Sequence, residues 1–372
     1  MKKRVICAGH SCLDITPEIP DLHARRIDDV IEPGKLLQVG QAKVSGGGSV
    51  SNTGLGMKIL GTDVILMTKV GDDAFGDILA GIYQEYGADH VLVRQKGGST
   101  SYSVVLAIPG IDRVFIHHTG ANDTFCADDI RWDEVSDAAL FHFGYPPLMR
   151  RLYVDGGEEL VKIFSRARMV GAATSLDLAA VDPDSPAGKA DWRDILTRML
   201  PLVDFFCPSV EELCYMLDPV RFTQWKKRAD GGDVTEILNL ESDVIPLADT
   251  CMKMGAKVLL IKCGAPGMYL RTADERTLSA ISGRIGLDCG QWAHKDIFEK
   301  SYIPDRIRSG SGAGDTSIAA FLTAITEGYD PEMSLHLAAG TGASCVEEYD
   351  ALSGLKSFDE LKKKIQNGWK KT

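Results

Sequence analysis

Short apolar runs alternate with amphipathic stretches of helical period along most of the chain, and this alternation limits the fold more than any other feature. Runs of this length are typical of strands that are buried on both faces. A succession of strand, helix and strand predicts an α/β fold with a mostly parallel central sheet, since parallel strands need crossover connections. The predicted strands are 4–8, 63–68, 138–143, 172–177, 203–207 and 257–262. The predicted helices are 49–60, 74–86, 148–168, 209–217, 245–254, 313–327, 332–346 and 357–368.

Four segments depart from this alternation. Segments 12–44 and 98–118 show strands of period two with turn residues between them, which predicts a small accessory sheet outside the main one. Segment 218–243 is charged and helix-like, which predicts a solvated insertion. Segment 283–308 has no clear period and predicts a long loop, and such loops are often functional.

Composition excludes several classes of protein. Lys and Arg number 41 against 52 Asp and Glu, a net charge of −11, which argues against a general nucleic-acid binder. The nine cysteines include no C-x-x-C pair, which argues against zinc ribbons and thioredoxin-type sites and favours a reducing compartment. The apolar run that starts at Val5 stops at Gly9, too short for a secretory signal, and no stretch approaches the roughly 18 apolar residues of a membrane span. We therefore expect a cytoplasmic protein that binds neither nucleic acid nor membrane.

The strongest local pattern is the run Ser-Gly-Ser-Gly-Ala-Gly-Asp at 309–315, directly before an apolar helix. Its glycines allow consecutive backbone N–H groups to point at one ligand, and the positive end of the helix adds to their field, so the run suits a phosphate. Asp315 then has two interpretations. It either stabilises the helix end, which is the commoner role of such a residue, or acts as a base beside the anion site.

Two further glycine-bearing helix entries lie nearer the N-terminus. Gly-Gly-Gly-Ser-Val-Ser-Asn-Thr-Gly at 46–54 places Asn52 one or two turns into a predicted helix, facing the same side as the glycines. Val-Gly-Asp-Asp-Ala-Phe-Gly-Asp at 70–77 is a turn into the next helix with Asp72 or Asp73 as its cap. Each pattern alone is equally compatible with packing.

Together these three patterns resemble the ribokinase-like, or pfkB-type, family of carbohydrate kinases. That family carries Gly-Gly-x-x-x-Asn, then Val-Gly-x-Asp-x-x-Gly, then Gly-Ala-Gly-Asp, and all three occur here in order. The resemblance spans about residues 4–350 and implies one kinase domain over 1–372. It also implies a three-layer α/β/α sandwich with a mostly parallel sheet and a small β-sheet lid built from 12–44 and 98–118. Further matches are Gly9 with Asp14, Gly120-Ala121-Asn122, Pro208 to Leu213, and Lys262 to Gly267.

The resemblance implies ATP-dependent phosphorylation of a hydroxyl, expected to be primary, on a sugar or sugar-like substrate. Asp315 would accept the hydroxyl proton, and Mg²⁺ would travel with ATP under the influence of Glu212 through water. No Walker A sequence is present, which agrees with a different anion hole. The implied anion hole consists of Gly312, Ala313 and Gly314. The implied sugar contacts are Asp14, Gly47, Gly48 and Asn52. The implied nucleotide contacts are Ser209, Lys262, Gly264 and Gly267.

Three departures from the family pattern leave alternatives open. Ser209 replaces the Asn of the Asn-x-x-Glu motif that ends at Glu212, which shortens that polar contact. Ser309-Gly310 replaces the usual Asp-Thr pair, so a monovalent-cation site is in doubt. The chain before Gly312 is longer than expected, and with Trp292 and His294 it would either fold over the nucleotide or serve as decoration.

The substrate is not fixed by the sequence. No Arg follows Asp177 to grip a carboxylate, which argues against an acid sugar and leaves fructose, ribose, another neutral sugar or a nucleoside. The alternatives are a nucleoside kinase of the same family, a catalytically silent regulator that binds sugar or nucleotide, and a vitamin kinase, against which the signature at 47–52 speaks.

Aromatic and histidine side chains near the predicted lid have two interpretations each. Tyr102 and Tyr145 would stack on a nucleobase or simply pack in the core. The adjacent His117 and His118 fall on the predicted lid, where solvent-facing strand residues are more common than metal ligands. Lids pair in related kinases, so a homodimer is expected.

Overall fold

A nine-stranded sheet forms the centre of the computed structural model, which describes residues 2–24, 26–110 and 113–372. Residues 25, 111 and 112 of the predicted lid segments lie outside the described residues. The strand order is β13-β12-β11-β10-β9-β8-β1-β4-β5, parallel from β5 to β11 and antiparallel for β12 and β13. The strands are β1 (Arg4–Gly9), β4 (Asp63–Gly71), β5 (Asp89–Gln95), β8 (Leu140–Gly144), β9 (Ala173–Asp177), β10 (Phe205–Phe206), β11 (Val258–Lys262), β12 (Gly267–Thr272) and β13 (Asp296–Lys300).

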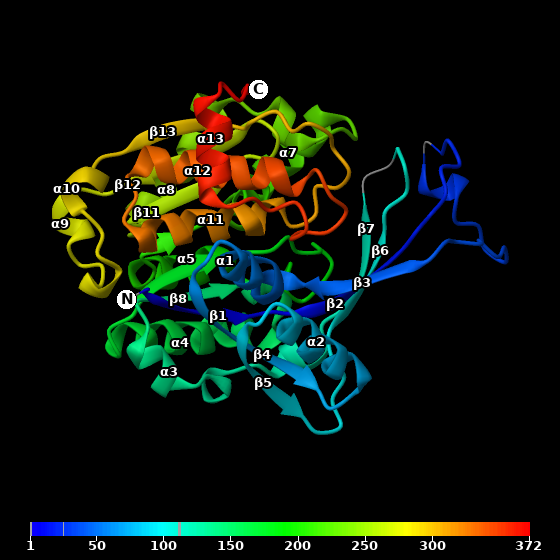
Figure 1. The fold of residues 1–372 in the computed structure, drawn as a ribbon, viewed down its shortest axis with the longest axis horizontal. Coiled ribbons are helices and arrows are strands. Elements are labelled where there is room, and N and C mark those ends of the chain that lie inside the picture. Colours follow the sequence, from blue (N-terminus) through cyan, green and yellow to red (C-terminus); the bar gives the residue numbers. More distant parts are fainter. Residues whose placement is uncertain (1, 25, 111–112) are drawn as a thin grey trace.

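Helices cover both faces of this sheet and produce two apolar cores (Figure 1). Alternate residues of β1 serve the two cores, since Val5 and Cys7 pack on one face and Ile6 and Ala8 on the other. The three-layer α/β/α sandwich predicted above is therefore confirmed. The helices are α1 (Leu55–Ile59), α2 (Ala74–Glu85), α3 (Trp132–Asp137), α4 (Glu158–Met169), α5 (Trp192–Met199), α6 (Val210–Leu217), α7 (Pro219–Ala229), α8 (Ile245–Lys253), α9 (Glu275–Leu278), α10 (Cys289–Trp292), α11 (Ala313–Glu327), α12 (Pro331–Cys345) and α13 (Phe358–Gln366).

A second, four-stranded sheet projects from the body, drawn in blue and cyan at the right of Figure 1. Its order is β3-β2-β6-β7, and only two residues separate the end of β1 from the start of β2. The small sheet is therefore attached at the carboxyl end of a central strand, where ligands bind in open α/β sheets. We call it the lid sheet, and its strands are β2 (Cys12–Pro17), β3 (Ala42–Gly47), β6 (Tyr102–Leu106) and β7 (Val114–His118).

The prediction of a long loop over 283–308 is wrong in part. Residues 296–300 form β13, which extends the main sheet beyond β12, and a short helix precedes it. Trp292 is buried against Phe321, with ring centroids 5.9 Å apart, so it serves the core instead of covering a nucleotide. The antiparallel partner β12 supplies the pairing that the irregular sequence pattern hides.

Two other predictions need correction. The segment 218–243 is not wholly solvated, because Trp225 of α7 is buried and its indole N–H donates to Asp243 Oδ1 over 2.9 Å. The helix predicted over 148–168 begins only at Glu158, since Gly156 and Gly157 have φ of 65° and 74° and interrupt it. Among the described residues, no helix combines the length and apolar character that crossing a membrane requires.

Candidate active site

Asp315 lies in the first turn of α11 and is 4% exposed. Gly312 caps this helix with φ of +74°, and a Cβ at this position would lie 2.2 Å from the Cβ of Ala351. Only glycine fits there, for reasons of both conformation and space. The glycine run therefore places the Asp315 carboxylate at the positive end of α11, as the sequence predicts.

Two side chains from distant parts of the sequence donate short hydrogen bonds to the Asp315 carboxylate, and Thr53 Oγ1 donates a longer one of 3.5 Å to Oδ1. Asn52 Nδ2 donates to Oδ2 over 2.9 Å, and the Tyr145 hydroxyl donates to Oδ1 over 2.7 Å. Burial raises the pKa of Asp315, while the charge of Lys262 and these two hydrogen bonds lower it. A carboxylate that is buried and held by two donors is suited to accept a proton from a third partner.

A buried ion pair lies beside this carboxylate. Lys262, the last residue of β11, donates from Nζ to Oδ1 of Asp177, the last residue of β9, over 2.7 Å. Burial lowers the pKa of Lys262, but the Asp177 carboxylate, together with the charges of Glu212 and Asp315, outweighs burial and raises that pKa overall. Burial likewise raises the pKa of Asp177 to about 8, against the pull of Lys262. Asp177 Oδ2 is buried and has no hydrogen-bond partner among the described residues.

The predicted anion hole lies against Lys262. A Cβ on Gly314 would be 3.4 Å from Lys262 Cδ, so the lysine side chain crosses the helix start. The Ala313 N–H donates to Gly310 O over a long 3.4 Å, a weak bond that an anion would readily replace. The same Cβ position on Gly314 is 3.7 Å from Lys262 Nζ, so the ammonium group lies near the start of α11.

The lid sheet supplies two of the predicted sugar contacts, Asp14 and Gly47. Asp14 lies on β2, and burial raises its pKa to about 6. A Cβ on Gly47 would be 2.2 Å from Asp14 Oδ2, so the glycine of β3 makes room for the carboxylate. Asp14 and Asn52 both line a cavity of about 490 Å³ between the lid sheet and the start of α11. Arg113 and Arg308 line the same cavity.

The predicted nucleotide contacts have clear structural roles of their own. Ser209 caps α6, where its N–H donates to Glu212 Oε2 over 2.9 Å and its Oγ accepts from Glu212 N over 3.2 Å. Gly267 has φ of +142°, and a Cβ there would meet Glu299 O of β13 at 2.1 Å. Gly264 has φ of +65° and lies against Thr235. These residues lie outside the cavity that holds Asp14 and Asn52.

Comparison with known proteins agrees with this geometry. The model of the pfkB family carbohydrate kinases matches residues 2–357. The chain belongs to the pfkB family of carbohydrate kinases. An uncharacterized sugar kinase of Archaeoglobus fulgidus is 24% identical over 302 residues, which cover 81% of this chain and 98% of the relative.

Solved structures show the same fold. Arabidopsis thaliana ribokinase, complexed with ribose and ATP, superposes with a TM-score of 0.70 at 20% identity over 98% of both chains. A putative ribokinase II of E. coli, in complex with ATP and Mg²⁺, gives a TM-score of 0.71 at 20% identity, covering 98% of this chain and 99% of that one. The present kinase is thus a carbohydrate kinase of ribokinase-like fold.

Three residues of this kinase make contacts or line the cavity in ways that the sequence did not predict. The Tyr145 hydroxyl donates to Asp315, and Asp177 pairs with Lys262. Arg113 brings a cation to the cavity although no arginine follows Asp177 in the sequence. Asp177 alone carried a usable signal, since it is an acid at the carboxyl end of a predicted strand.

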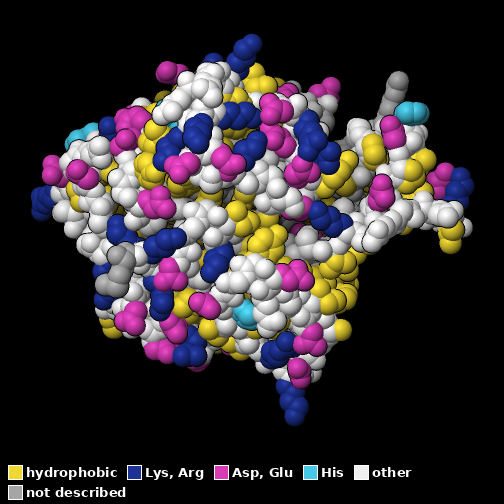
Figure 2. Space-filling model, viewed as in Figure 1, with side chains coloured by type: hydrophobic (Ala, Val, Ile, Leu, Met, Phe, Trp, Pro, Cys, Tyr) yellow, Lys and Arg dark blue, Asp and Glu magenta, His cyan; other side chains and the backbone are white. Residues whose placement is uncertain are grey.

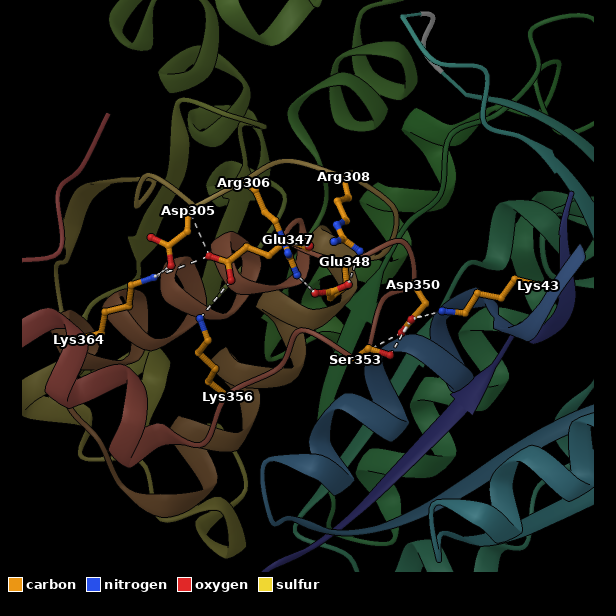
Figure 3. Close-up of polar contacts among 10 residues, drawn as sticks. All are labelled: Lys43, Asp305, Arg306, Arg308, Glu347, Glu348, Asp350, Ser353, Lys356 and Lys364. Atoms are coloured by element: carbon orange, nitrogen blue, oxygen red, sulfur yellow. Dashed lines mark hydrogen bonds and ion pairs between the residues drawn. The ribbon is translucent and has the colours of Figure 1, made fainter. Parts of the chain in front are cut away.

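Ion pairs tie the loop between α12 and α13 to the neighbouring segments (Figure 3). Asp350 of this loop pairs with Lys43 of β3, which links the loop to the lid sheet. Glu348 pairs with Arg306 and Arg308 of the segment that leads into the glycine run. The kinase therefore holds its lid sheet and its glycine run against the same loop.

Proposed function

We propose that this kinase transfers the γ-phosphoryl group of ATP to a hydroxyl, expected to be primary, of a sugar or sugar-like substrate. The observation that carries the proposal is the hydrogen bond between Asn52 and Asp315, residues 263 positions apart. It joins the predicted base to a predicted sugar contact at the wall of the cavity that Asp14 also lines. A hydroxyl held by Asp14 and Asn52 would lie within reach of Asp315.

Proton transfer is the role proposed for Asp315. As the substrate oxygen forms its bond to the γ-phosphorus, its O–H bond breaks and the proton passes to the Asp315 carboxylate, while the bond from the γ-phosphorus to the leaving oxygen of ADP breaks. Asp14 accepts hydrogen bonds from substrate hydroxyls, and Asn52 can both donate and accept. Gly47 and Gly48 let the substrate approach the backbone.

Charge stabilisation is the role proposed for the start of α11. The amides of Gly312, Ala313 and Gly314 and the Lys262 ammonium would face the equatorial oxygens of the transferring group. Ser209, Gly264 and Gly267 would border the nucleotide farther along the sheet edge, where Lys262 also ends β11.

The acidic character of the site fits a requirement for Mg²⁺. Glu212 and Asp315 both raise the pKa of Asp177, so these carboxylates lie within electrostatic range of one another. Asp177 Oδ2 is buried without a partner among the described residues, and Mg²⁺ prefers oxygen ligands and retained waters. The Asp177 carboxylate, with Glu212 through water, would hold the ion, which when bound neutralises phosphate charge that these carboxylates would otherwise repel.

A coupled assay of ADP formation tests the proposal. Wild-type kinase is offered ATP, Mg²⁺ and a panel of neutral sugars, acid sugars, sugar phosphates and nucleosides. Rapid turnover with a sugar supports the proposal, and turnover with nucleosides alone would replace it by the nucleoside kinase alternative. Thermal shifts that respond to sugar and ATP analogue, without turnover of any substrate, would favour the silent regulator.

Arg113 favours a second candidate substrate. Its guanidinium lines the cavity with Asp14 and donates to Ser311 Oγ at the glycine run. Guanidinium groups recognise carboxylates and phosphates through paired N–H donors. A sugar with a carboxylate or phosphate away from the reacting hydroxyl therefore becomes a candidate, and it is favoured if Arg113→Gln slows turnover of the anionic substrates in the panel but not of the neutral ones.

The lid sheet is also the proposed dimer contact. Its edge strand β7 exposes Phe115 and Ile116, and Val44 on the opposite edge strand β3 is also exposed. Apolar side chains are visible on the projecting lid sheet in Figure 2. Sedimentation equilibrium tests the proposal, which predicts a dimer for wild type and a monomer for Phe115→Ser combined with Ile116→Ser.

A further inference from the structure

Three potential metal ligands meet at the base of the lid sheet. His10 lies between β1 and β2, Cys12 is the first residue of β2, and His117 lies on β7. One nitrogen of each histidine and the Cys12 sulfur all lie within 4.8 Å of one another. The two imidazole rings have centroids 5.2 Å apart.

Sheet register explains why residues so far apart in sequence meet. Asp14 pairs with Ser103, and Ser103 pairs with His117, so these residues form one row across three strands. Cys12 lies two residues before Asp14 and therefore on the same face. His118 points to the opposite face, where it is exposed and contacts Ser99 Oγ. The solvent-facing interpretation of the histidine pair therefore holds for His118 and is wrong for His117.

Each histidine has one nitrogen held and one nitrogen unpaired. Ser101 Oγ lies 3.4 Å from His10 Nε2, and Ser103 Oγ lies 3.0 Å from His117 Nδ1. His10 Nδ1 and His117 Nε2 are buried and have no hydrogen-bond partner among the described residues. His10 itself is 1% exposed. A buried polar atom without a partner costs free energy, and a hydrogen-bond partner on the opposite ring nitrogen is the usual support of a metal-binding histidine.

The surroundings keep the unpaired nitrogen of His10 available. A Cβ on Gly48 would lie 2.5 Å from His10 Nδ1, so the glycine leaves space at this atom.

We propose that His10, Cys12 and His117 bind one divalent metal ion of the zinc class. Two imidazoles and a thiolate select zinc, cobalt and similar ions, whereas Mg²⁺ and Ca²⁺ prefer oxygen ligands. In a tetrahedral zinc site the ligand atoms are about 3.5 Å apart. The distances among the two ring nitrogens and the Cys12 sulfur therefore have to shorten by about 1 Å. Cys12 and His117 lie on the lid sheet, and a small movement of that sheet toward His10 brings them together.

Binding is a simple exchange of a proton for a metal ion. The Cys12 S–H bond breaks, its proton passes to solvent, and the thiolate binds the metal together with the two ring nitrogens, with no change in oxidation state. At present the thiol donates to Asp14 Oδ1 over 3.3 Å. The Asp14 carboxylate therefore lies beside the proposed site. This ion is separate from the Mg²⁺ that accompanies ATP, and its binding does not depend on kinase activity.

Titration of the full-length kinase with Co²⁺ tests the proposal. Protein stripped with a chelator is expected to bind one Co²⁺ with a sulfur-to-cobalt charge-transfer band, and Zn²⁺ is expected to displace the ion. Cys12→Ser should abolish the band although eight other cysteines remain. His117→Gln should weaken Co²⁺ binding at least tenfold, and the matched control His118→Gln should leave it unchanged.

Three results would overturn the site. They are the absence of stoichiometric Co²⁺ binding to wild type, a charge-transfer band that survives in Cys12→Ser, and equal binding by His117→Gln and His118→Gln. Thermal unfolding of each variant shows whether it is folded. If Cys12→Ser does not fold, the comparison of His117→Gln with His118→Gln alone decides whether the site exists.

Discussion

The hydroxyl of Tyr145 donates a hydrogen bond to Oδ1 of Asp315 over 2.7 Å, and this contact joins the carboxyl end of β8 to the start of α11. Asn52 holds the other carboxylate oxygen. The proposed base is thus fixed from two sides before any substrate arrives. A fixed base needs no reorganisation during proton transfer, which is how preorganised groups lower a barrier.

Replacing Asp315 by Asn should reduce kcat by about 10²–10⁴-fold while sugar and ATP analogue still bind. Asn keeps the shape of the side chain but loses the charge and the proton acceptor. Asp330→Asn is the matched control, since Asp330 caps α12 away from the cavity and its replacement should leave kcat unchanged. The rate of ADP production by the two variants tests this prediction. If Asp315→Asn turns over within threefold of wild type, Asp315 is not the base.

Tyr145→Phe should move the acid limb of the kcat/KM profile to higher pH. The hydrogen bond from Tyr145 lowers the pKa of Asp315, so its loss raises that pKa and leaves less carboxylate at a given acidic pH. A hydrogen bond to a charged group of about 1.5–3 kcal/mol corresponds to a shift of about one to two pH units. Tyr102→Phe serves as control, and an unmoved limb in Tyr145→Phe would contradict a positioning role.

Sugar affinity should fall as the pH drops below about 6, because burial raises the pKa of Asp14 to about 6. Above this pH the carboxylate accepts hydrogen bonds from substrate hydroxyls, and below it protonation removes that capacity. Asp14→Asn should bind sugar weakly at every pH, without this step, and should bind ATP analogue normally. Calorimetric titration across pH measures both ligands, with Asp21→Asn as an exposed control. Parallel losses of sugar and nucleotide would indicate a folding defect.

Lys262→Met should lower the free energy of unfolding by roughly 3–5 kcal/mol, because it leaves Asp177 buried without its partner. The folded-state pKa of Asp177 is already raised, and loss of the cation raises it further. The penalty should therefore be smaller below about pH 8, where Asp177 is protonated in both proteins, and should grow toward its full value as the pH rises above 8.

Denaturant unfolding at several pH values measures this penalty. Adding Asp177→Asn to Lys262→Met should remove most of it together with its pH dependence. Lys295→Met breaks the more exposed pair with Glu332 and should cost less than about 1 kcal/mol. If the loss of unfolding free energy in Lys262→Met does not depend on pH, the buried Asp177 carboxylate is not its cause.

Lys43→Gln should loosen the lid sheet. The Lys43 ammonium pairs with Asp350 across the gap between β3 and the loop that follows α12 (Figure 3). Because the Lys43 side chain is about half exposed, we expect the pair to be worth about 1 kcal/mol, so KM for sugar should rise by no more than about fivefold with kcat unchanged. Hydrogen exchange in 42–47 should accelerate without ligand. Lys35→Gln, which breaks only the local pair with Glu32, should change neither quantity.

Substrate should slow hydrogen exchange in the strands of the lid sheet more than elsewhere, because closure over the cavity has to expel water. The comparison of exchange with and without sugar and ATP analogue measures this directly. Unchanged exchange in β2 and β6 on binding would show that this sheet is no lid.

Local signals in the sequence were enough to predict the architecture and to single out Asp315 and Asn52, to which the family resemblance then assigned roles. Alternating apolar runs predicted the parallel sheet, because burial on both faces imposes the same pattern wherever the strand lies. The glycine runs predicted where α11 and the segment before α1 begin, since positive φ and close backbone approach restrict those positions to glycine. Asp315 and Asn52 follow from their distance to these runs.

Long-range packing decided the rest. The sequence does not show that Tyr145 and Asn52 hold the same carboxylate, that Lys262 pairs with Asp177, or that β13 extends the sheet, because each depends on which strands become neighbours. Strand register likewise turns His117 toward Cys12 and His118 toward solvent, although the two are adjacent in the chain. Side-chain direction along a strand reverses at every residue, so only the paired sheet determines which histidine faces inward.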